Sequence, residues 1–141
     1  MKIMLDKGAI MPTRAHQYDA GLDLYAPEGS GVYCITPCGG SVSIDTGVHV
    51  EIPKGYYGEV RSKSGLLFKH CVVTDGTVDA GYTGSIKVKL LNHHHCIRYD
   101  VNPGDKIAQL VIVPCLLPEL ELVDSLEETD RGDNGFGSTG R

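Results

Sequence analysis

Glycine and proline interrupt this sequence so often that it has little room for long helices. Eighteen glycines and seven prolines are spread over 141 residues, and most runs between them are about five to eight residues long. Runs of that length suit β-strands, which average about five to six residues, better than α-helices, which average about eleven. We expect strands at residues 22–26, 42–45, 48–52, 56–60, 86–91, 107–113 and 120–123.

The pattern inside these runs agrees with half-buried strands. Residues 85–90 read Ser-Ile-Lys-Val-Lys-Leu, which puts Ile86, Val88 and Leu90 on one face. Turn signals such as Asp75-Gly76 separate the runs. Many short strands with regular turns predict an all-β fold, most simply a jelly-roll-like distorted barrel. Only residues 64–70 are expected to be helical, with Ser64 as a candidate N-cap.

Composition indicates a single domain. The length fits one domain, and 41% hydrophobic residues are enough for a core. Apolar residues become scarce near residue 124, so we expect a β-domain over residues 1–123 and a flexible, glycine-rich arm over residues 124–141. No apolar run approaches the roughly 20 residues of a membrane helix, and the first residues turn polar too soon for a signal peptide. A cytoplasmic protein is therefore expected.

Charge and cysteine usage limit the partners. The net charge of −5 disfavours a nucleic-acid polymer, although a few local cations could still bind a small anion. Five cysteines include only one close pair, Cys34 and Cys38, with no second pair to complete a zinc site, so buried or incidental thiols are expected. The run His93-His-His-Cys96 is expected to be a polar loop, because three adjacent side chains do not easily converge on one ion.

The C-terminal segment Arg131-Gly-Asp-Asn-Gly-Phe-Gly-Ser-Thr-Gly140 has the composition of a phosphate-binding arm. Glycines let backbone N–H groups converge on an anion, Ser138 and Thr139 add hydroxyl donors, and Arg131 can form a two-pronged pair with phosphate. Phe136 could stack on a flat group such as a base. The alternative is a disordered glycine-rich terminus.

A second segment, Arg61-Ser-Lys-Ser-Gly65, gathers two cations and two hydroxyls before the expected helix, which also suits phosphate. A solvated loop is the alternative. A third segment, residues 74–84, resembles a hairpin with a pocket, in which Asp79 and Tyr82 could both face the pocket. Asp79 could orient or deprotonate a water there, or it could simply cap a turn.

Two polar residues stand among apolar neighbours. Asp23 lies in Ala20-Gly-Leu-Asp-Leu, where a charge is unfavourable unless it is paired. It could lie near a metal ion or form a salt bridge with an arginine or lysine, and the sequence does not separate these. Gln109 lies in Gly104-Asp-Lys-Ile-Ala-Gln-Leu110 and needs a hydrogen-bond partner in the core.

Together these five segments resemble, in order and spacing, the five motifs of the trimeric dUTP pyrophosphatase (dUTPase) family. The likeness covers residues 19–140, nearly the whole chain. It implies a β jelly roll assembled as a homotrimer, with active sites shared between subunits. It also implies hydrolysis of dUTP to dUMP and pyrophosphate by water attack on the α-phosphorus, with Mg2+ bound to the triphosphate.

The resemblance also implies residue roles. Asp79 matches the carboxylate that activates water, Tyr82 the ring packed under the deoxyribose, and Asp23 the residue that holds metal-bound waters. Gln109 matches a polar group beside the α-phosphate. By the same resemblance, the backbone of Gly76, Thr77 and Val78 binds uracil, Lys87 contributes through its backbone, and Ser64 and Gly65 contact phosphate. In the C-terminal arm, Arg131 binds the γ-phosphate, Phe136 covers the uracil, and Gly137, Ser138 and Thr139 surround the triphosphate.

One position departs from the family pattern. Lys63 stands where the family usually has arginine, so the charge is kept but the forked geometry is lost. Arg61 points the same way if this stretch is extended. Two rival readings are a dCTP deaminase of the same fold and a nucleotide-responsive regulator without catalysis. The first would need a glutamate in the pocket hairpin, and residues 74–84 contain none.

Overall fold

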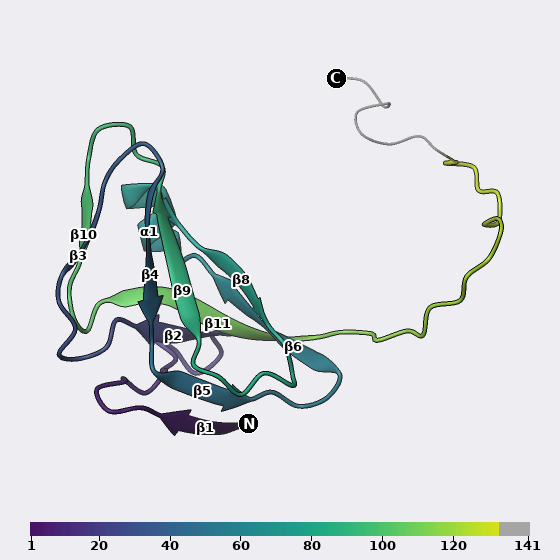
Figure 1. Ribbon diagram of the computed structural model, residues 1–141, viewed down its shortest axis with the longest axis horizontal. Helices are drawn as coiled ribbons and strands as arrows, with labels where there is room; N and C mark the ends of the chain where they lie inside the picture. Colours follow the sequence, from purple (N-terminus) through teal and green to yellow (C-terminus); the bar gives the residue numbers. More distant parts are fainter. Residues whose placement is uncertain (133–141) are drawn as a thin grey trace.

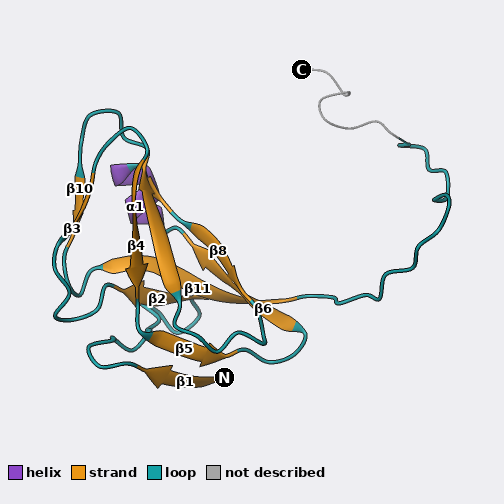
Figure 2. Cartoon of the chain, in the orientation of Figure 1, coloured by secondary structure: helices purple, strands orange, loops and turns teal. Residues whose placement is uncertain are grey.

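The computed structural model describes residues 1–132 as short strands with one helix, α1 (Ser64–His70) (Figures 1 and 2). The strands are β1 (Lys2–Leu5), β2 (Gly21–Tyr25), β3 (Tyr33–Ile35), β4 (Gly40–Asp45), β5 (Val48–Glu51), β6 (Tyr56–Arg61), β7 (Val72–Val73), β8 (Asp75–Val78), β9 (Lys87–Asn92), β10 (Tyr99–Val101) and β11 (Lys106–Pro114).

The largest sheet has four antiparallel strands in the order β2-β11-β6-β8. Its register places Leu110 beside both Leu22 and Val60 on one row, and Gln109 beside both Asp23 and Arg61 on the next. Because side chains alternate between the faces of a sheet, these rows point in opposite directions. One face of the sheet is therefore apolar and the other polar.

A second sheet has the order β4-β9-β7, and two-stranded pairs β1-β5 and β3-β10 complete the framework. Its buried residues Ile44, Val88 and Leu90 join those of the large sheet, such as Leu24 and Leu110, in one hydrophobic core. Each of these side chains is at most 1% exposed, and burying one fully contributes about 1.5–3 kcal/mol. The core therefore fixes the register that orders the polar face.

These features confirm an all-β fold with one short helix, although the sheets do not close into a barrel. The helix covers the expected residues 64–70, but its N-cap is Lys63, in an extended conformation, and no side chain caps it. The expectation that Ser64 caps the helix was wrong, since Ser64 is already helical. Cys71 ends the helix in the left-handed conformation, with φ at 56°.

The end of the chain also differs from expectation. The last strand in the described part of the chain ends at Pro114. Residues 120–123 form no strand: Leu120 and Leu122 are fully exposed, and no strand within residues 1–132 pairs with them. From residue 115 to 132 the chain leaves the body as an extended segment (Figure 1). No helix in the described residues is long and apolar enough to cross a bilayer.

Candidate active site

The polar face of the large sheet carries a row of polar and charged side chains. Asp23, Gln109, Arg61 and Asp75 lie side by side on β2, β11, β6 and β8. A hollow of about 600 Å3 opens over part of this face, and Lys63 reaches it from the segment after β6. We call it the sheet hollow. Its lining is Ala15, Asp19, Ala20, Gly21, Asp23, Glu59, Arg61, Ser62, Lys63, Gln109 and Val111.

Asp23 is the most deeply buried charge in the sheet hollow, at 5% exposure. Its Oδ1 accepts a short hydrogen bond from Lys63 Nζ, and its Oδ2 forms a salt bridge with Lys106 Nζ at 2.8 Å. Burial acts to raise the pKa of Asp23, but Lys106 and Lys63 outweigh it and hold that pKa below its usual value. The salt bridge left open by the sequence is therefore present, to two lysines.

Lys106 is a residue of this site that the sequence analysis did not select. A β-bulge interrupts the pairing of β11 with β2 between Lys106 and Ala108. Consequently Ile107 and Ala108 are both buried, and Lys106 points to the same side as Gln109, where it reaches Asp23. Strict alternation would have put Lys106 on the apolar face. Lys106 could have been predicted from the expectation that a buried aspartate needs a second cation beside it.

Gln109, which is partly buried, has the hydrogen-bond partner that its place among apolar residues requires. Its Nε2 donates to the carbonyl oxygen of Ser62 at 3.2 Å. The Ser62 hydroxyl in turn donates to the Thr74 carbonyl and accepts from the Thr74 amide, both at 2.8 Å. A Cβ on Gly21 would collide with the Gln109 side chain, whose Cβ would be only 3.0 Å away. Glycine at position 21 therefore leaves the space in which Gln109 lies.

The segment after β6 brings two cations to the same hollow. Lys63 has φ −77° and ψ 137°, so the chain is extended up to the start of α1, and Arg61 and Lys63 both line the hollow, as the alternation predicts. Arg61 Nη1 also lies 3.5 Å from Glu59 Oε2. Ser64 and Gly65 form the first residues of α1, next to this hollow.

A second pocket, of about 240 Å3, is formed by β8 and the loop that follows it. We call it the hairpin pocket. It brings together the predicted residues Gly76, Thr77, Val78, Asp79, Tyr82 and Lys87, with Val60, Ser85 and Ile86. Within residues 1–132, β8 is at the edge of its sheet and pairs only with β6, and its residues Gly76, Thr77 and Val78 line the pocket.

The loop of the hairpin pocket is closed by its own hydrogen bonds. The Tyr82 amide donates to the Asp79 carbonyl at 3.0 Å, and the Tyr82 hydroxyl donates to the Ser85 carbonyl at 3.0 Å. The ring lies over Gly84, where an added Cβ would be 2.9 Å from Tyr82 Cε2. Glycine at position 84 therefore lets the ring lie flat against the loop, about half exposed.

The two cavities share no lining residue within residues 1–132. Val60 and Val78, at the hairpin pocket, belong to the apolar rows of the sheet, whereas Asp23 and Gln109 belong to the polar face. The predicted site residues thus form two groups in one chain. Arg131 lies in the segment beyond β11. Phe136, Gly137, Ser138 and Thr139 lie outside the described residues.

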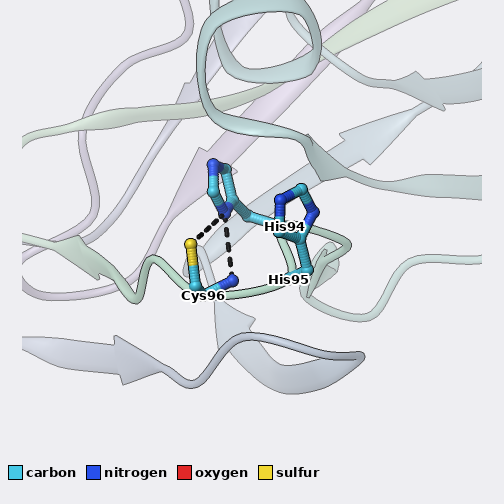
Figure 3. Close-up of side chains that lie close together, drawn as sticks. All are labelled: His94, His95 and Cys96. Atoms are coloured by element: carbon cyan, nitrogen blue, oxygen red, sulfur yellow. Dashed lines mark hydrogen bonds between the residues drawn. The ribbon is translucent and has the colours of Figure 1, made fainter.

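The run after β9 brings the His94, His95 and Cys96 ligand atoms within 4.8 Å of one another (Figure 3). His94 Nδ1 accepts hydrogen bonds from the amides of Cys96 and Ile97, at 3.2 and 3.1 Å. The ring nitrogen nearest to the thiol is therefore engaged in closing a turn. Of the five free cysteines, Cys34, Cys38, Cys71 and Cys96 are exposed and Cys115 is partly buried. Of the two expectations, buried or incidental thiols, burial does not hold for these four.

Comparison with known proteins shows the family to which this chain belongs. The dUTPase family model matches residues 7–140. The chain belongs to the dUTPase family. A probable deoxyuridine 5'-triphosphate nucleotidohydrolase of Schizosaccharomyces pombe is 42% identical over 137 residues, covering 96% of this chain and 94% of the relative. The enzyme of Gloeothece citriformis is 45% identical over 139 residues, covering 96% and 92%.

Solved dUTPases also share the fold. The dUTPase of Staphylococcus bacteriophage 80alpha with dUPNHPP superposes with a TM-score of 0.87 at 34% identity, covering 99% of this chain and 98% of that one. A mutant dUTPase of phage phi11 of S. aureus, solved with a structural Mg(II) ion, has a TM-score of 0.80 at 32% identity, covering 90% and 98%. The fold is therefore shared over nearly the full length of both chains.

Proposed function

We propose that this dUTPase family member hydrolyses dUTP to dUMP and pyrophosphate by attack of water on the α-phosphorus. The observation that carries the proposal is the hairpin pocket, in which a strand edge, an aromatic ring and a carboxylate meet. Family membership supports the substrate, since the relatives carry the name deoxyuridine 5'-triphosphate nucleotidohydrolase. A role as a dCTP deaminase lacks support, because the hairpin holds no glutamate.

The strand edge suits recognition of uracil. The backbone of Gly76, Thr77 and Val78 offers alternating N–H and C=O groups, and a uracil edge also alternates donors and acceptors. The hydrogen bond from the Tyr82 hydroxyl to the Ser85 carbonyl holds this side chain beside the loop, where its ring is proposed to pack against the sugar. A ring packed against the deoxyribose leaves no room for a 2′-hydroxyl, which distinguishes dUTP from UTP. Lys87 contributes its backbone beside this pocket.

Asp79 is the proposed general base. It follows directly after β8 and lines the hairpin pocket, so its carboxylate can accept a proton from a water placed between it and the α-phosphorus. Gln109 is proposed to act beside the α-phosphate, and Lys63, Ser64 and Gly65 to bind phosphate oxygens. Positioning and charge neutralisation supply most of the rate in phosphoryl chemistry.

The arm and a metal complete the proposed site. Arg131 would bind the γ-phosphate, Phe136 would cover the uracil, and Gly137, Ser138 and Thr139 would surround the triphosphate. Mg2+ would neutralise charge on the triphosphate. Asp23 fits such a metal, because its carboxylate lines the sheet hollow and each carboxylate oxygen can accept a further hydrogen bond from a metal-bound water beside its lysine partner.

We propose that the active site is shared between copies of the chain in a homotrimer. The residues proposed to bind the base and the sugar line the hairpin pocket, whereas Lys63 and Gln109, proposed to bind near the phosphates, line the sheet hollow, and the two cavities share no lining residue within residues 1–132. Two separate cavities for one nucleotide support a site to which two chains contribute. A neighbouring copy that presents its sheet hollow to the hairpin pocket would complete the site. The five free thiols support a reducing, cytoplasmic location.

The decisive experiment measures pyrophosphate release from dUTP with Mg2+, beside UTP, dCTP and dTTP. We expect release from dUTP only. Asp79→Asn should lower kcat about a thousandfold while dUTP still binds, since a general base contributes about 10²–10⁴-fold. Asp75→Asn changes a carboxylate on the same hairpin that faces Arg61 instead, and should retain most activity. Binding of dUTP by the wild type without pyrophosphate release would refute the enzyme and favour a regulatory binding role.

A further inference from the structure

The loop of the hairpin pocket is tied to the body of the molecule by a histidine from another strand. His49, on β5, approaches the Thr83 carbonyl with Nδ1 at 2.8 Å, and its Nε2 lies 3.2 Å from Asp6 Oδ2. Its side chain is 17% exposed. Thr83 directly follows Tyr82, the ring proposed to pack under the sugar. The imidazole therefore connects the loop to the segments after β1 and within β5.

A second tie fixes the far end of the same loop. The Ser85 hydroxyl donates a short hydrogen bond to Asp45, whose Oδ1 also accepts from the Gly47 amide at 3.1 Å. The Ser85 carbonyl accepts from the Tyr82 hydroxyl. The end of the loop at Ser85 is held by a serine and an aspartate that do not depend on protonation near neutral pH. The contact at Thr83 depends on a group that titrates there.

We propose that His49 is a positioning residue for the hairpin pocket: as an imidazolium it donates from Nδ1 to Thr83 and from Nε2 to Asp6, and thereby holds the loop in the conformation that places Tyr82. This inference rests on the proposed function. It assigns to β5 a part in substrate binding although β5 lines neither of the two cavities of the site.

The proton count explains why the charged form matters. A neutral imidazole has one N–H, so it can donate to Thr83 or to Asp6 but not to both. The Thr83 carbonyl and Asp6 therefore raise the pKa of His49, against a smaller opposing effect of burial. Other charges nearby are Asp45, itself close to Lys87, and the Lys2–Glu51 pair along the adjoining groove.

The sign of the pH dependence follows. Because the folded pKa is raised above the unfolded value of about 6.5, both hydrogen bonds are present together below that value, and one of the two is lost as pH rises through the folded pKa. The contact lies in an open groove of about 380 Å3 between β1, β5 and Thr83, outside the hydrophobic core. Losing it should loosen the loop without unfolding the protein.

Two substitutions separate the two hydrogen bonds. An asparagine amide occupies the place of Nδ1, and a glutamine amide the place of Nε2. His49→Asn should keep the bond to Thr83 and leave the KM for dUTP within about twofold of wild type at pH 6. His49→Gln should keep only the Asp6 contact and raise KM about tenfold at that pH, the effect of one charge-assisted hydrogen bond, with kcat little changed.

The pH profile is the readout that a purely structural role would not move. The ratio of the His49→Gln KM to the wild-type KM cancels titration of the substrate. It should be about ten near pH 6 and smaller near pH 9, because wild-type His49 then has one N–H to share between Thr83 and Asp6. Asp6→Asn removes the carboxylate that favours the charged ring, so the midpoint should move to lower pH. Lys2→Gln, in the same groove, should leave the ratio unchanged.

The outcomes separate the inference from the function on which it rests. Equal KM values for wild type and His49→Gln at every pH, with normal turnover, would overturn the role of His49 alone. No turnover of dUTP by the wild type would overturn the function. In that case, amide hydrogen exchange in residues 79–85 still tests the tie, because faster exchange is expected in His49→Gln than in His49→Asn, and equal rates would refute it.

Discussion

The two cavities are built in different ways. The sheet hollow lies on paired strands, and its central carboxylate, Asp23, is held by two lysines while Gln109 is held by Ser62. The hairpin pocket is formed by one edge strand and a loop, which Tyr82, His49 and Asp45 fasten at single points. The difference suggests a division of labour: a rigid surface suits phosphates, whose charge needs fixed donors, whereas a loop can adapt to a base and a sugar.

The largest effect on activity is expected in a test of whether the two cavities of one chain bind the same nucleotide. Asp79→Asn disables the hairpin pocket and Gln109→Ala disables the sheet hollow. Each variant alone should be nearly inactive. Refolded together in equal amounts, they should recover up to roughly a quarter of wild-type activity, because sites that combine residues of two neighbours are intact by chance in one of four cases.

The same mixture can also refute the assignment of the two cavities to different subunits. A chain carrying both substitutions, refolded with itself, is the matched control and should stay inactive. Pyrophosphate release from dUTP measures the recovery, and light scattering measures the mass of the assembly. If the two single variants recover nothing although a trimer forms, each site belongs to one chain, and the assignment of the cavities to different subunits is wrong.

A smaller effect is expected from crowding the ring of the hairpin pocket. Gly84→Ala puts a Cβ 2.9 Å from Tyr82 Cε2, so the ring must leave its place against the loop. We expect KM for dUTP to rise about tenfold, the effect of losing one aromatic contact of about 1–1.5 kcal/mol. Gly81→Ala, in the same loop, meets no atom within 4 Å and should leave KM unchanged. Equal KM values for the two variants would show that Tyr82 does not touch the substrate.

The two cavities also differ in how far the sequence predicts them. Asp79 and Tyr82 are close in sequence, and the turn residues around them were enough to predict a pocket. Asp23 and Gln109 were recognised as polar residues in apolar strands, but their juxtaposition depends on the register of β2 and β11. That register is set by the whole core, so it could not be read from either segment alone.

The contacts of Lys106 and His49 could not be predicted from the sequence. The bulge at Ile107 reverses the alternation of β11 and turns Lys106 toward Asp23, and nothing in the local residue types announces it. His49 looks like a polar residue on the exposed side of a half-buried strand, and its contact with Thr83 spans 34 positions. The strand expected at residues 120–123 failed for the related reason that alternation needs a partner strand.

The smallest expected effect concerns the stability of the sheet hollow. Asp23→Asn removes a buried charge and leaves Lys63 and Lys106 without their carboxylate, so the free energy of unfolding should fall by about 1–2 kcal/mol. The effect stays below that of a fully buried pair because the Lys106 side chain is 43% exposed. Lys2→Gln breaks an ion pair of similar length between exposed side chains and should change stability by less than about 0.5 kcal/mol.

The dependence on pH shows whether charge is the cause. Because the folded pKa of Asp23 is lowered, its contribution is fully present above the unfolded pKa of about 3.9 and is lost as pH falls through the folded value. Urea unfolding of wild type and Asp23→Asn should therefore give a constant difference between about pH 5 and 8 that shrinks below pH 4. A difference that persists in acid would mean that Asp23 stabilises the sheet through packing, and the sheet hollow would then be no more electrostatic in origin than the hairpin pocket.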